Sequence, residues 1–151
     1  MSKLGEKILP TIALYSNRIG AATVLYNGVA LSDLTVGHGI DTKDYDSAMF
    51  VLNVGNVLGA SAALNAAVYE CATDTPLLST LVTGASFTAA SASAMTNQIQ
   101  TGLVKTKATK RYLWLRTATT GAPLTVDVSG VCVLGMADSL PTPTGDQVFD
   151  V

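Results

Sequence analysis

Two segments of alternating bulky residues constrain the fold of this chain more than any other feature. In residues 44–55, DYDSAMFVLNVG, a turn-forming start precedes a run in which Phe50, Leu52 and Val54 share one side of an extended chain. In residues 111–116, RYLWLR, aromatic residues alternate with leucines in the same way. A period of two is typical of β-strands. These turn-and-strand units predict a β-sandwich or barrel, and neither contains a catalytic set of residues.

The surface of the folded chain is expected to be poor in charge. Charged residues make up 13% and hydrophobic residues 48% of the 151 residues, whereas an average soluble domain has about 25% charged residues. A chain of this length can bury a core without disulfides or metals, so one domain is expected. The shortage of charge predicts that another protein copy covers part of the surface. The net charge of −2 provides no general attraction to nucleic acid or to an anionic membrane.

The few charges are unevenly distributed along the chain. No acidic residue lies between Asp74 and Asp127, and this interval contains a basic segment, which comprises Lys105, Lys107, Lys110 and Arg111. Acidic residues gather instead in residues 33–46 and 138–150. One hypothesis is that the basic segment of one copy meets an acidic loop or tail of another copy. The alternative is a solvated loop with ordinary lysines.

Composition divides the chain into an arm, a domain and a tail. Residues 1–21 are predicted to form an N-terminal arm that lies on a neighbour, because they are too apolar to remain free in water; their apolar residues are Ile8, Leu9, Ile12, Leu14 and Tyr15. The alternative is a first strand or short helix of the same core. Residues 22–138 are predicted to form the β-sandwich domain. Residues 139–151 are predicted to form a C-terminal tail that is extended and exposed at 140–146, with Val148, Phe149 and Val151 as apolar contact points beyond that stretch.

Turn signals delimit a series of short strands inside the domain. Asn27-Gly28 between hydrophobic runs predicts a two-residue hairpin turn, because both residues tolerate positive φ angles. Strands are expected at about 47–54, 64–72, 77–82, 98–104, 111–118 and 124–135, and a loop anchored by Phe87 is expected at 85–97. Several short strands at this spacing, with few helix signals, indicate an all-β sandwich or jelly roll.

Residues suited to catalysis or metal binding do not form a recognised motif. His38 lies between two glycines, but no GxSxG motif accompanies it, so a structural or exposed role is expected. Asp41, Asp44 and Asp46 have the spacing of alternate calcium ligands, yet the glycine and glutamate of an EF-hand loop are missing. Turn formation is the expected role of these aspartates. We therefore expect no enzyme activity, no cofactor and no metal site.

The aromatic residues near Trp114, the two cysteines and the N-terminal segment each allow more than one interpretation. Aromatic residues interleaved with basic ones near Trp114 could stack on nucleic-acid bases, but alternate strand positions and the acidic balance favour a core role. Cys71 and Cys132 lie in apolar runs without CxxC spacing, which is typical of small core residues; a disulfide between them is the alternative. The N-terminal residues lack the pattern of a signal peptide, and no apolar run approaches the ~20 residues of a membrane span.

The order of several segments resembles the small capsid decoration, or cement, proteins of tailed bacteriophages. The resemblance covers about residues 40–141 and rests on DYDSAMFVLNVG (44–55), VYE (68–70), LVTGASFT (81–88), KRYLWLR (110–116) and VCVLG (131–135). It implies a jelly roll or related β-sandwich without catalytic residues, on the outside of an icosahedral shell where major capsid subunits meet. The implied partners are the major capsid protein and further copies of the chain, in a homo-oligomer with a trimer as the family-based expectation.

Under this resemblance the chain is a structural virion protein on the capsid exterior, assembled in the host cytoplasm, that cements contacts between capsid subunits. We expect the contacts to come from the arm and the basic segment, that is from Ile8, Leu9, Ile12, Leu14, Tyr15, Lys105, Lys107, Lys110 and Arg111. The alternative is another β-sandwich virion component, such as a head–tail connector, a tail protein or a host-adhesion module. A small enzyme built around His38 is the third hypothesis.

Overall fold

A computed structural model describes residues 8–19, 24–27, 29–30, 39–59, 63–91, 97–121, 125–135 and 146–151. The strands are β1 (Ile8–Ile19), β2 (Val24–Tyr26), β3 (Val29–Ala30), β4 (Ile40–Asp41), β5 (Ser47–Leu58), β6 (Ala63–Cys71), β7 (Thr80–Ser86), β8 (Ala90–Ser91), β9 (Gln98–Lys105), β10 (Tyr112–Thr120), β11 (Thr125–Gly135) and β12 (Asp146–Asp150). The described residues also include two short 3-10 helices in loops, η3 (Pro76–Leu78) and η4 (Thr106–Ala108). No helix among these residues is long and apolar enough to cross a membrane.

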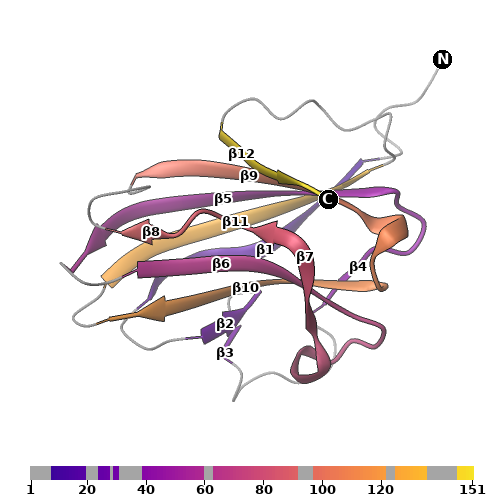
Figure 1. The fold of residues 1–151 in the computed structure, drawn as a ribbon, viewed down its shortest axis with the longest axis horizontal. Coiled ribbons are helices and arrows are strands. Elements are labelled where there is room, and N and C mark those ends of the chain that lie inside the picture. Colours follow the sequence, from indigo (N-terminus) through magenta and orange to yellow (C-terminus); the bar gives the residue numbers. More distant parts are fainter. Residues whose placement is uncertain are drawn as a thin grey trace.

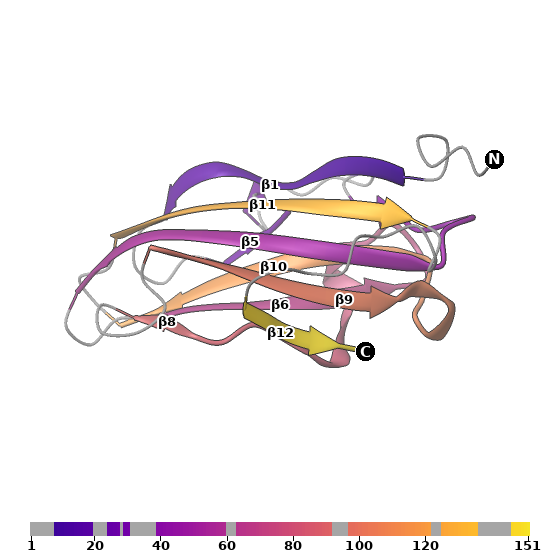
Figure 2. The same ribbon diagram turned by 90° about the horizontal axis from the view of Figure 1, so that it is seen from above.

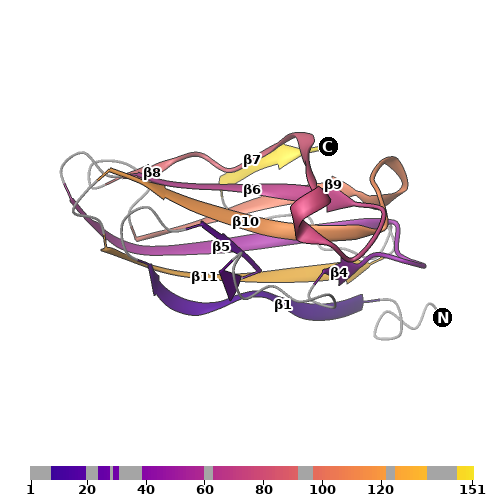
Figure 3. The same cartoon turned by 90° about the horizontal axis from the view of Figure 1, so that it is seen from below.

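The strands form two sheets that pack face to face as a sandwich (Figure 1). One sheet, here called the β5 sheet, has the order β1-β11-β5-β9-β12, which Figure 2 shows from edge to edge. The other, the β10 sheet, has the order β3-β2-β10-β6-β7, with β4 beside β10 and β8 beside β6. Figure 3 shows β7, β6 and β10 side by side in this second sheet.

Strands β1, β2, β5, β6, β7, β9, β10 and β11 are paired in the order of a jelly roll. β1 pairs with β11, β2 with β10, β5 with β9, and β6 with β7, all antiparallel. The first of these strands thus pairs with the last and the second with the next to last, as in one long hairpin folded over into two sheets. This connectivity joins two Greek keys, as in a jelly roll. The predicted all-β sandwich or jelly-roll fold is confirmed.

Strand alternation places one face of each sheet in a shared core. Phe50, Leu52 and Val54 of β5 are almost fully buried, as the sequence predicts, and Leu113 and Leu115 of β10 join them from the other sheet. Burying each such side chain contributes about 1.5–3 kcal/mol relative to leaving it exposed. These two strands therefore carry the centre of the sandwich.

The two cysteines belong to different sheets. Cys71 ends β6 and Cys132 lies in β11; both are buried and both are free thiols. Burial raises the pKa of the Cys132 thiol. The interpretation of these residues as small buried side chains holds, and the alternative of a disulfide between them does not.

Two predicted segments differ from the structure in detail. Residues 77–82, expected as a strand, are divided between η3 and the start of β7, because Pro76 opens a short helical turn. The loop expected at 85–97 contains β8, which pairs with β6. Phe87 is its buried anchor, as predicted.

The predicted Asn27-Gly28 turn is confirmed by strand pairing. β2 and β3 are antiparallel, and Tyr26 stands opposite Val29, so two residues connect them. Asn27 has a positive φ of 47°. The turn was predicted because asparagine tolerates this conformation.

The predicted arm and tail both contain strands, which lie at the two edges of the β5 sheet. β1 pairs with β11 from Ile8 opposite Gly135 to Ile19 opposite Val126. At the other edge, β12 runs parallel to β9. Phe149, predicted to be an apolar contact point, is 7% exposed and packs against Phe87 with ring centroids 4.9 Å apart. Residues 1–7 and 136–145 lie outside the described residues, and the division into arm, domain and tail stays a prediction.

Candidate functional site

The predicted basic segment lies at one end of the sandwich, at the right of Figure 1. Lys105 ends β9, Lys107 lies in η4, and Lys110 and Arg111 precede β10. Main-chain hydrogen bonds tie this segment to the loop of residues 39–46: Thr42 N–H donates to the Arg111 carbonyl at 2.9 Å, and Thr106 N–H to the Asp46 carbonyl at 2.9 Å. The loop of residues 72–79 joins through Asp74, whose Oδ1 accepts the Gly39 N–H at 2.7 Å.

Arg111 and Asp41 form a two-point ion pair at this end. Arg111 Nε and Nη2 donate to Oδ1 and Oδ2 of Asp41 at 2.9 and 2.6 Å. The hydrogen bond from Arg111 is the largest cause of the low pKa of Asp41, which falls from 3.8 to about 2. The two side chains are 48% and 43% exposed. Solvent screening therefore limits the contribution of the pair to stability to about 0–1 kcal/mol.

Lys107 and Lys110 also meet acidic residues of the same chain. Lys107 Nζ lies 3.0 Å from Asp46 Oδ1. Lys110 Nζ lies 3.7 Å from Glu70 Oε1 and 2.9 Å from the Thr80 hydroxyl oxygen. Much of the positive charge that was predicted to meet an acidic surface on another copy is thus compensated within the chain. A role of this segment in contacts with another subunit stays a prediction.

The apolar residues of the predicted arm are distributed along β1. In the ladder with β11, Ile8, Leu9, Ile12 and Leu14 stand opposite Gly135, Leu134, Val131 and Gly130, and Tyr15 lies in an irregular stretch before Asn17. One row of the sheet runs from Ile8 through Gly135 and Ser47 to Lys105. The start of β1 therefore reaches the end that carries the basic segment, whereas Leu14 lies near the middle of the sheet. Of the basic segment, Lys105 shares this sheet with β1, whereas Lys107 lies in η4 and Lys110 and Arg111 precede β10. A contact role for either group stays a prediction.

The residues considered for catalysis or metal binding do not assemble in the described part of the chain. Asp41 and Asp46 are engaged in the ion pairs described above, and Asp44 has a positive φ of 70°. Across the described ranges, no three His, Cys, Asp or Glu side chains are grouped so that they could hold a metal ion. His38 lies outside the described residues.

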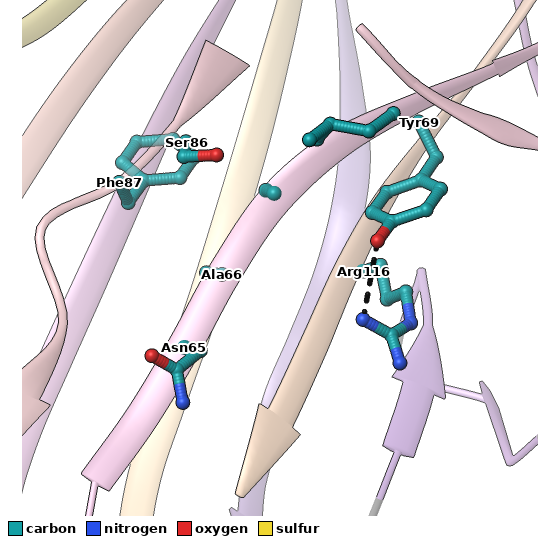
Figure 4. Close-up of a pocket in the computed structure, with 8 residues that line it drawn as sticks. Asn65, Ala66, Tyr69, Ser86, Phe87 and Arg116 are labelled. Carbon is teal, nitrogen blue, oxygen red and sulfur yellow. Dashed lines mark hydrogen bonds between the residues drawn. The ribbon is translucent and has the colours of Figure 1, made fainter. Parts of the chain in front are cut away.

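A cluster that the sequence did not predict lies on the outer face of the β10 sheet. Arg116 stands opposite Tyr26 on β2 and Ala67 on β6. Its guanidinium lies 5.8 Å from the ring centroid of Tyr26 and 5.3 Å from that of Tyr69. Nη1 donates to the Tyr69 hydroxyl at 3.3 Å (Figure 4). Each of these cation–π contacts contributes about 0.5–1 kcal/mol, and more where water is excluded.

Trp114 belongs to the same face of β10 but is fully buried. Its ring meets that of Tyr26 edge-on, with centroids 6.4 Å apart. Gly39 approaches it so closely that a Cβ at this position would lie 2.9 Å from the indole. The loop of residues 39–46 therefore covers Trp114, which leaves its ring no surface on which a nucleic-acid base could stack.

A pocket of about 220 Å³ opens beside Arg116. It is lined by Asn65, Ala66, Ala67, Tyr69, Leu81, Ser86, Phe87 and Arg116 (Figure 4). Most of the lining belongs to β6 and β7, and Arg116 reaches it from β10. The pocket thus lies on the outside of the sandwich.

The outer face of the β5 sheet carries an apolar row. Val51 of β5 stands opposite Val131 of β11, which in turn stands opposite Ile12 of β1. Val131 is 42% exposed. A second exposed apolar group, Leu77 and Leu78, lies in η3 at the end of the sandwich. These surfaces suit contacts with another protein.

Comparisons with known proteins identify a fold. No protein-family model and no curated protein sequence matches the chain. The chain is similar to the solved structure of the infectious bursal disease virus VP2 subviral particle, with a TM-score of 0.50 and 12% identity over 86% of this chain and 32% of that chain. It is also similar to the structure of the infectious bursal disease virus Gt strain, with a TM-score of 0.50 and 11% identity over 86% of this chain and 32% of that chain.

The chain therefore spans about a third of the length of the chains that it matches. At this level of identity, the likeness concerns the arrangement of strands. It agrees with the strand pairing described above, and the protein has a β-sandwich fold of the jelly-roll type.

Proposed function

We propose that this protein is a structural component of a virus particle. In the narrower form of the proposal, it binds the outer surface of the mature capsid of a tailed bacteriophage and cements contacts between major capsid protein subunits. The observation that carries the proposal is the jelly-roll strand order, because the chain shares its fold with the VP2 subviral particle of a virus. The segments that resemble phage cement proteins support the narrower form.

The distribution of charge supports a role in assembly. Charged residues are few, and Lys107, Lys110 and Arg111 of the basic segment pair with acidic residues of the same chain. The apolar row that contains Val51 and Val131 is left partly exposed on a sheet face. Covering such a row on association removes apolar surface from water, which is the main driving force for protein–protein contacts. We propose that copies of the chain form a homo-oligomer, with a trimer as the first candidate.

The cementing mechanism is one of linked equilibria. A protein that binds only the expanded lattice stabilises that lattice over its precursor, because any ligand shifts a population toward the state that it prefers. An oligomer that engages several capsid subunits at once gains avidity without any new contact. No chemical step is needed.

Edge strand β1 offers a main-chain route for the same contact. In the order of the described strands it is the outermost member of the β5 sheet. The outer backbone groups of an edge strand can pair with a strand from another protein. This arrangement gives the predicted arm residues a way to contact a neighbour while β1 remains in its own sheet.

Co-sedimentation tests the proposal directly. The purified chain is mixed with mature, undecorated phage heads and separately with unexpanded proheads, after light scattering has given its oligomeric state. We expect an oligomer that pellets with mature heads alone. A monomer that pellets with neither particle would contradict the cementing role.

A charged substitution in the apolar row tests whether this row contacts the capsid. Val131→Lys should weaken co-sedimentation, because it puts an ammonium group where apolar surface is buried. Val131→Thr keeps the β-branched shape and serves as the matched control, and Leu58→Lys adds the same charge at another exposed apolar position. Leu58 lies on β5 far from Val51, so equal pelleting of Val131→Lys and Leu58→Lys would exclude the apolar row as the contact.

A host-adhesion module of a virion is the second candidate function. The observation that favours it is the pocket lined by Arg116, because an open pocket with one cation and aromatic walls suits a small ligand. Binding of a cell-surface glycan, without binding to phage heads, would move the proposal to this candidate.

A further inference from the structure

The pocket beside Arg116 arises where β7 leaves β6. Tyr69 stands opposite Leu81 and Ala67 stands opposite Ser86. One residue of β6, Val68, therefore separates these pairs on one strand, while residues 82–85 separate them on the other. The extra residues of β7 form a bulge that includes Gly84, which has a positive φ of 83°. Such bulges commonly occur where a strand edge has been reshaped for a site.

The floor of the pocket is made of small side chains. Ala66 and Ala67 line it, and Leu81 and Phe87 add apolar wall. Asn65 contributes an amide group with both donors and acceptors. The volume of about 220 Å³ is below the ~300–1,000 Å³ of pockets for drug-sized ligands. It suits a ligand unit the size of one sugar ring.

Arg116 is the cation of this pocket, and its charge is not balanced by a carboxylate among the described residues. By contrast, Lys107, Lys110 and Arg111 each have an acidic partner. Within the described ranges, the Arg116 guanidinium donates a hydrogen bond to the neutral Tyr69 hydroxyl. Its Nε is buried and has no hydrogen-bond partner in the described part of the chain.

A partly buried guanidinium without a carboxylate partner among the described residues favours one class of ligand. Its planar, forked donors match a carboxylate, and such bonds are roughly twice as strong as those between neutral groups. A phosphate of higher charge is usually met by several cations or by a cluster of backbone N–H groups, and no second cation lines this pocket. The single charge of Arg116 therefore fits a monoanion. Asn65 and Ser86 add groups that can bond to hydroxyls.

We propose that the Arg116 pocket binds an acidic sugar unit, with the sugar carboxylate on the Arg116 guanidinium and the sugar hydroxyls toward Asn65 and Ser86. The binding site is independent of the capsid contacts proposed above, because it lies on the β10 sheet and those contacts lie on the β5 sheet. Failure of head binding would leave this proposal intact. On a particle with many copies, weak single sites of this kind would gain avidity on a glycan-covered surface.

Titration followed by NMR tests the proposal with matched probes. Methyl glucuronide and methyl glucoside differ at one position, a carboxylate in place of a hydroxymethyl group. We expect the glucuronide to bind at least about tenfold more tightly, since hydrogen bonds to charged groups exceed neutral ones by roughly that factor. The amide signals of Leu81 and Ser86 and the Arg116 Nε–H signal should shift together. Equal affinity for the two probes, or no binding of either, would overturn the proposal.

Variants separate the site from general charge effects. Arg116→Met should weaken glucuronide binding about tenfold or more, whereas Lys43→Met, which removes the same charge at an exposed loop position, should leave it unchanged. Tyr69→Phe keeps the ring, removes the hydroxyl that holds Nη1, and should cause a smaller loss. If Arg116→Met does not fold, as judged from its amide spectrum, Tyr69→Phe and the pocket-filling Ala67→Leu decide. Unchanged affinity in these variants would contradict the site.

A third probe distinguishes the source of the carboxylate. N-acetylaspartate amide represents an acidic side chain from a neighbouring protein copy. We expect it to bind more weakly than the glucuronide, because it cannot use the hydroxyl-binding groups of the pocket. Binding of N-acetylaspartate amide with no binding of the glucuronide would overturn the sugar assignment.

Discussion

Asn27 connects the β2–β3 turn to β10 through both its main chain and its side chain. Its N–H donates to the Leu115 carbonyl at 2.9 Å, and its Oδ1 accepts the Leu115 N–H at 2.7 Å. The side chain thus supplies an acceptor to a buried N–H group at the point where the turn interrupts the ladder. Few residues can do this at a positive φ, and asparagine is one of them.

We expect Asn27→Gly to lower the free energy of unfolding by about 1–3 kcal/mol, because the Leu115 N–H loses its buried acceptor. Glycine tolerates the positive φ, so backbone strain does not contribute. Urea denaturation measures the loss. The matched control is Asn97→Gly, since Asn97 also has a positive φ, 54°, but an exposed side chain. An equal loss in both variants would contradict the role of the Asn27 side chain.

The Asp41–Arg111 pair gives a prediction about pH. The pKa of Asp41 is lowered from 3.8 to about 2 in the folded state. Its contribution to stability is therefore complete above about pH 4 and disappears as the pH falls toward 2. Carboxyl-carbon NMR should give a midpoint near 2 for Asp41, and Arg111→Met should return it toward 3.8. A midpoint near 3.8 in the parent protein would show that the pair does not form.

At the scale of elements, the packing of β12 against β9 requires a glycine in β9. Phe149 of β12 lies over Gly102, where an added Cβ would come within 2.1 Å of a ring atom. The same ring packs against Phe87. Beyond β12, the Val151 N–H donates to the Leu103 carbonyl at 3.0 Å and continues the attachment to β9. Glycine at position 102 therefore allows the C-terminal strand to close this sheet edge.

Gly102→Ala should displace Phe149 and destabilise the protein by about 1–3 kcal/mol, the usual cost of overpacking. Thermal unfolding gives the change in stability, and faster hydrogen exchange of the Val151 amide would show that the C-terminal strand has loosened. Phe149→Leu in the same background should recover part of the loss, because it removes the ring that the new methyl group meets. Additive effects of the two substitutions would contradict the contact.

Local patterns predicted the strands, and long-range pairing produced what those patterns missed. Phe50, Leu52 and Val54 alternate clearly, so β5 and its buried face could be predicted from the sequence. The cluster around Arg116 could not be predicted from the sequence. Tyr26 and Tyr69 lie on β2 and β6, the two neighbours of β10, and only the pairing register places both beside Arg116. The ion pairs of the basic segment were missed for the same reason.

At the scale of the whole molecule, the fold is dominated by pairs that are distant in sequence. Ile8 stands opposite Gly135, and Tyr112 stands opposite Cys71. A single sequence shows that each of these segments is extended but not which segment it meets. The sandwich class followed from strand spacing, while the jelly-roll order of the strands required the structure.

This topology predicts slow folding. Long loops must close before distant strands can pair, so refolding from urea should take milliseconds to seconds or longer, as in other all-β sandwiches. Stopped-flow fluorescence can follow it through Trp114, which is fully buried in the native state. Complete refolding within microseconds would contradict this expectation.

The pairing of β1 with β11 also determines how the molecule responds to tension. Ile8 and Gly135 lie at the same end of an antiparallel ladder. A force that separates these two residues would break the hydrogen bonds of the ladder one after another. In a shear geometry, by contrast, all of these bonds would bear the force together. The ladder is therefore mechanically weak along this line. If this fold holds capsid subunits together against internal pressure, we expect the force to pass through the sheet faces. The ends of β1 and β11 at Ile8 and Gly135 would then carry little tension.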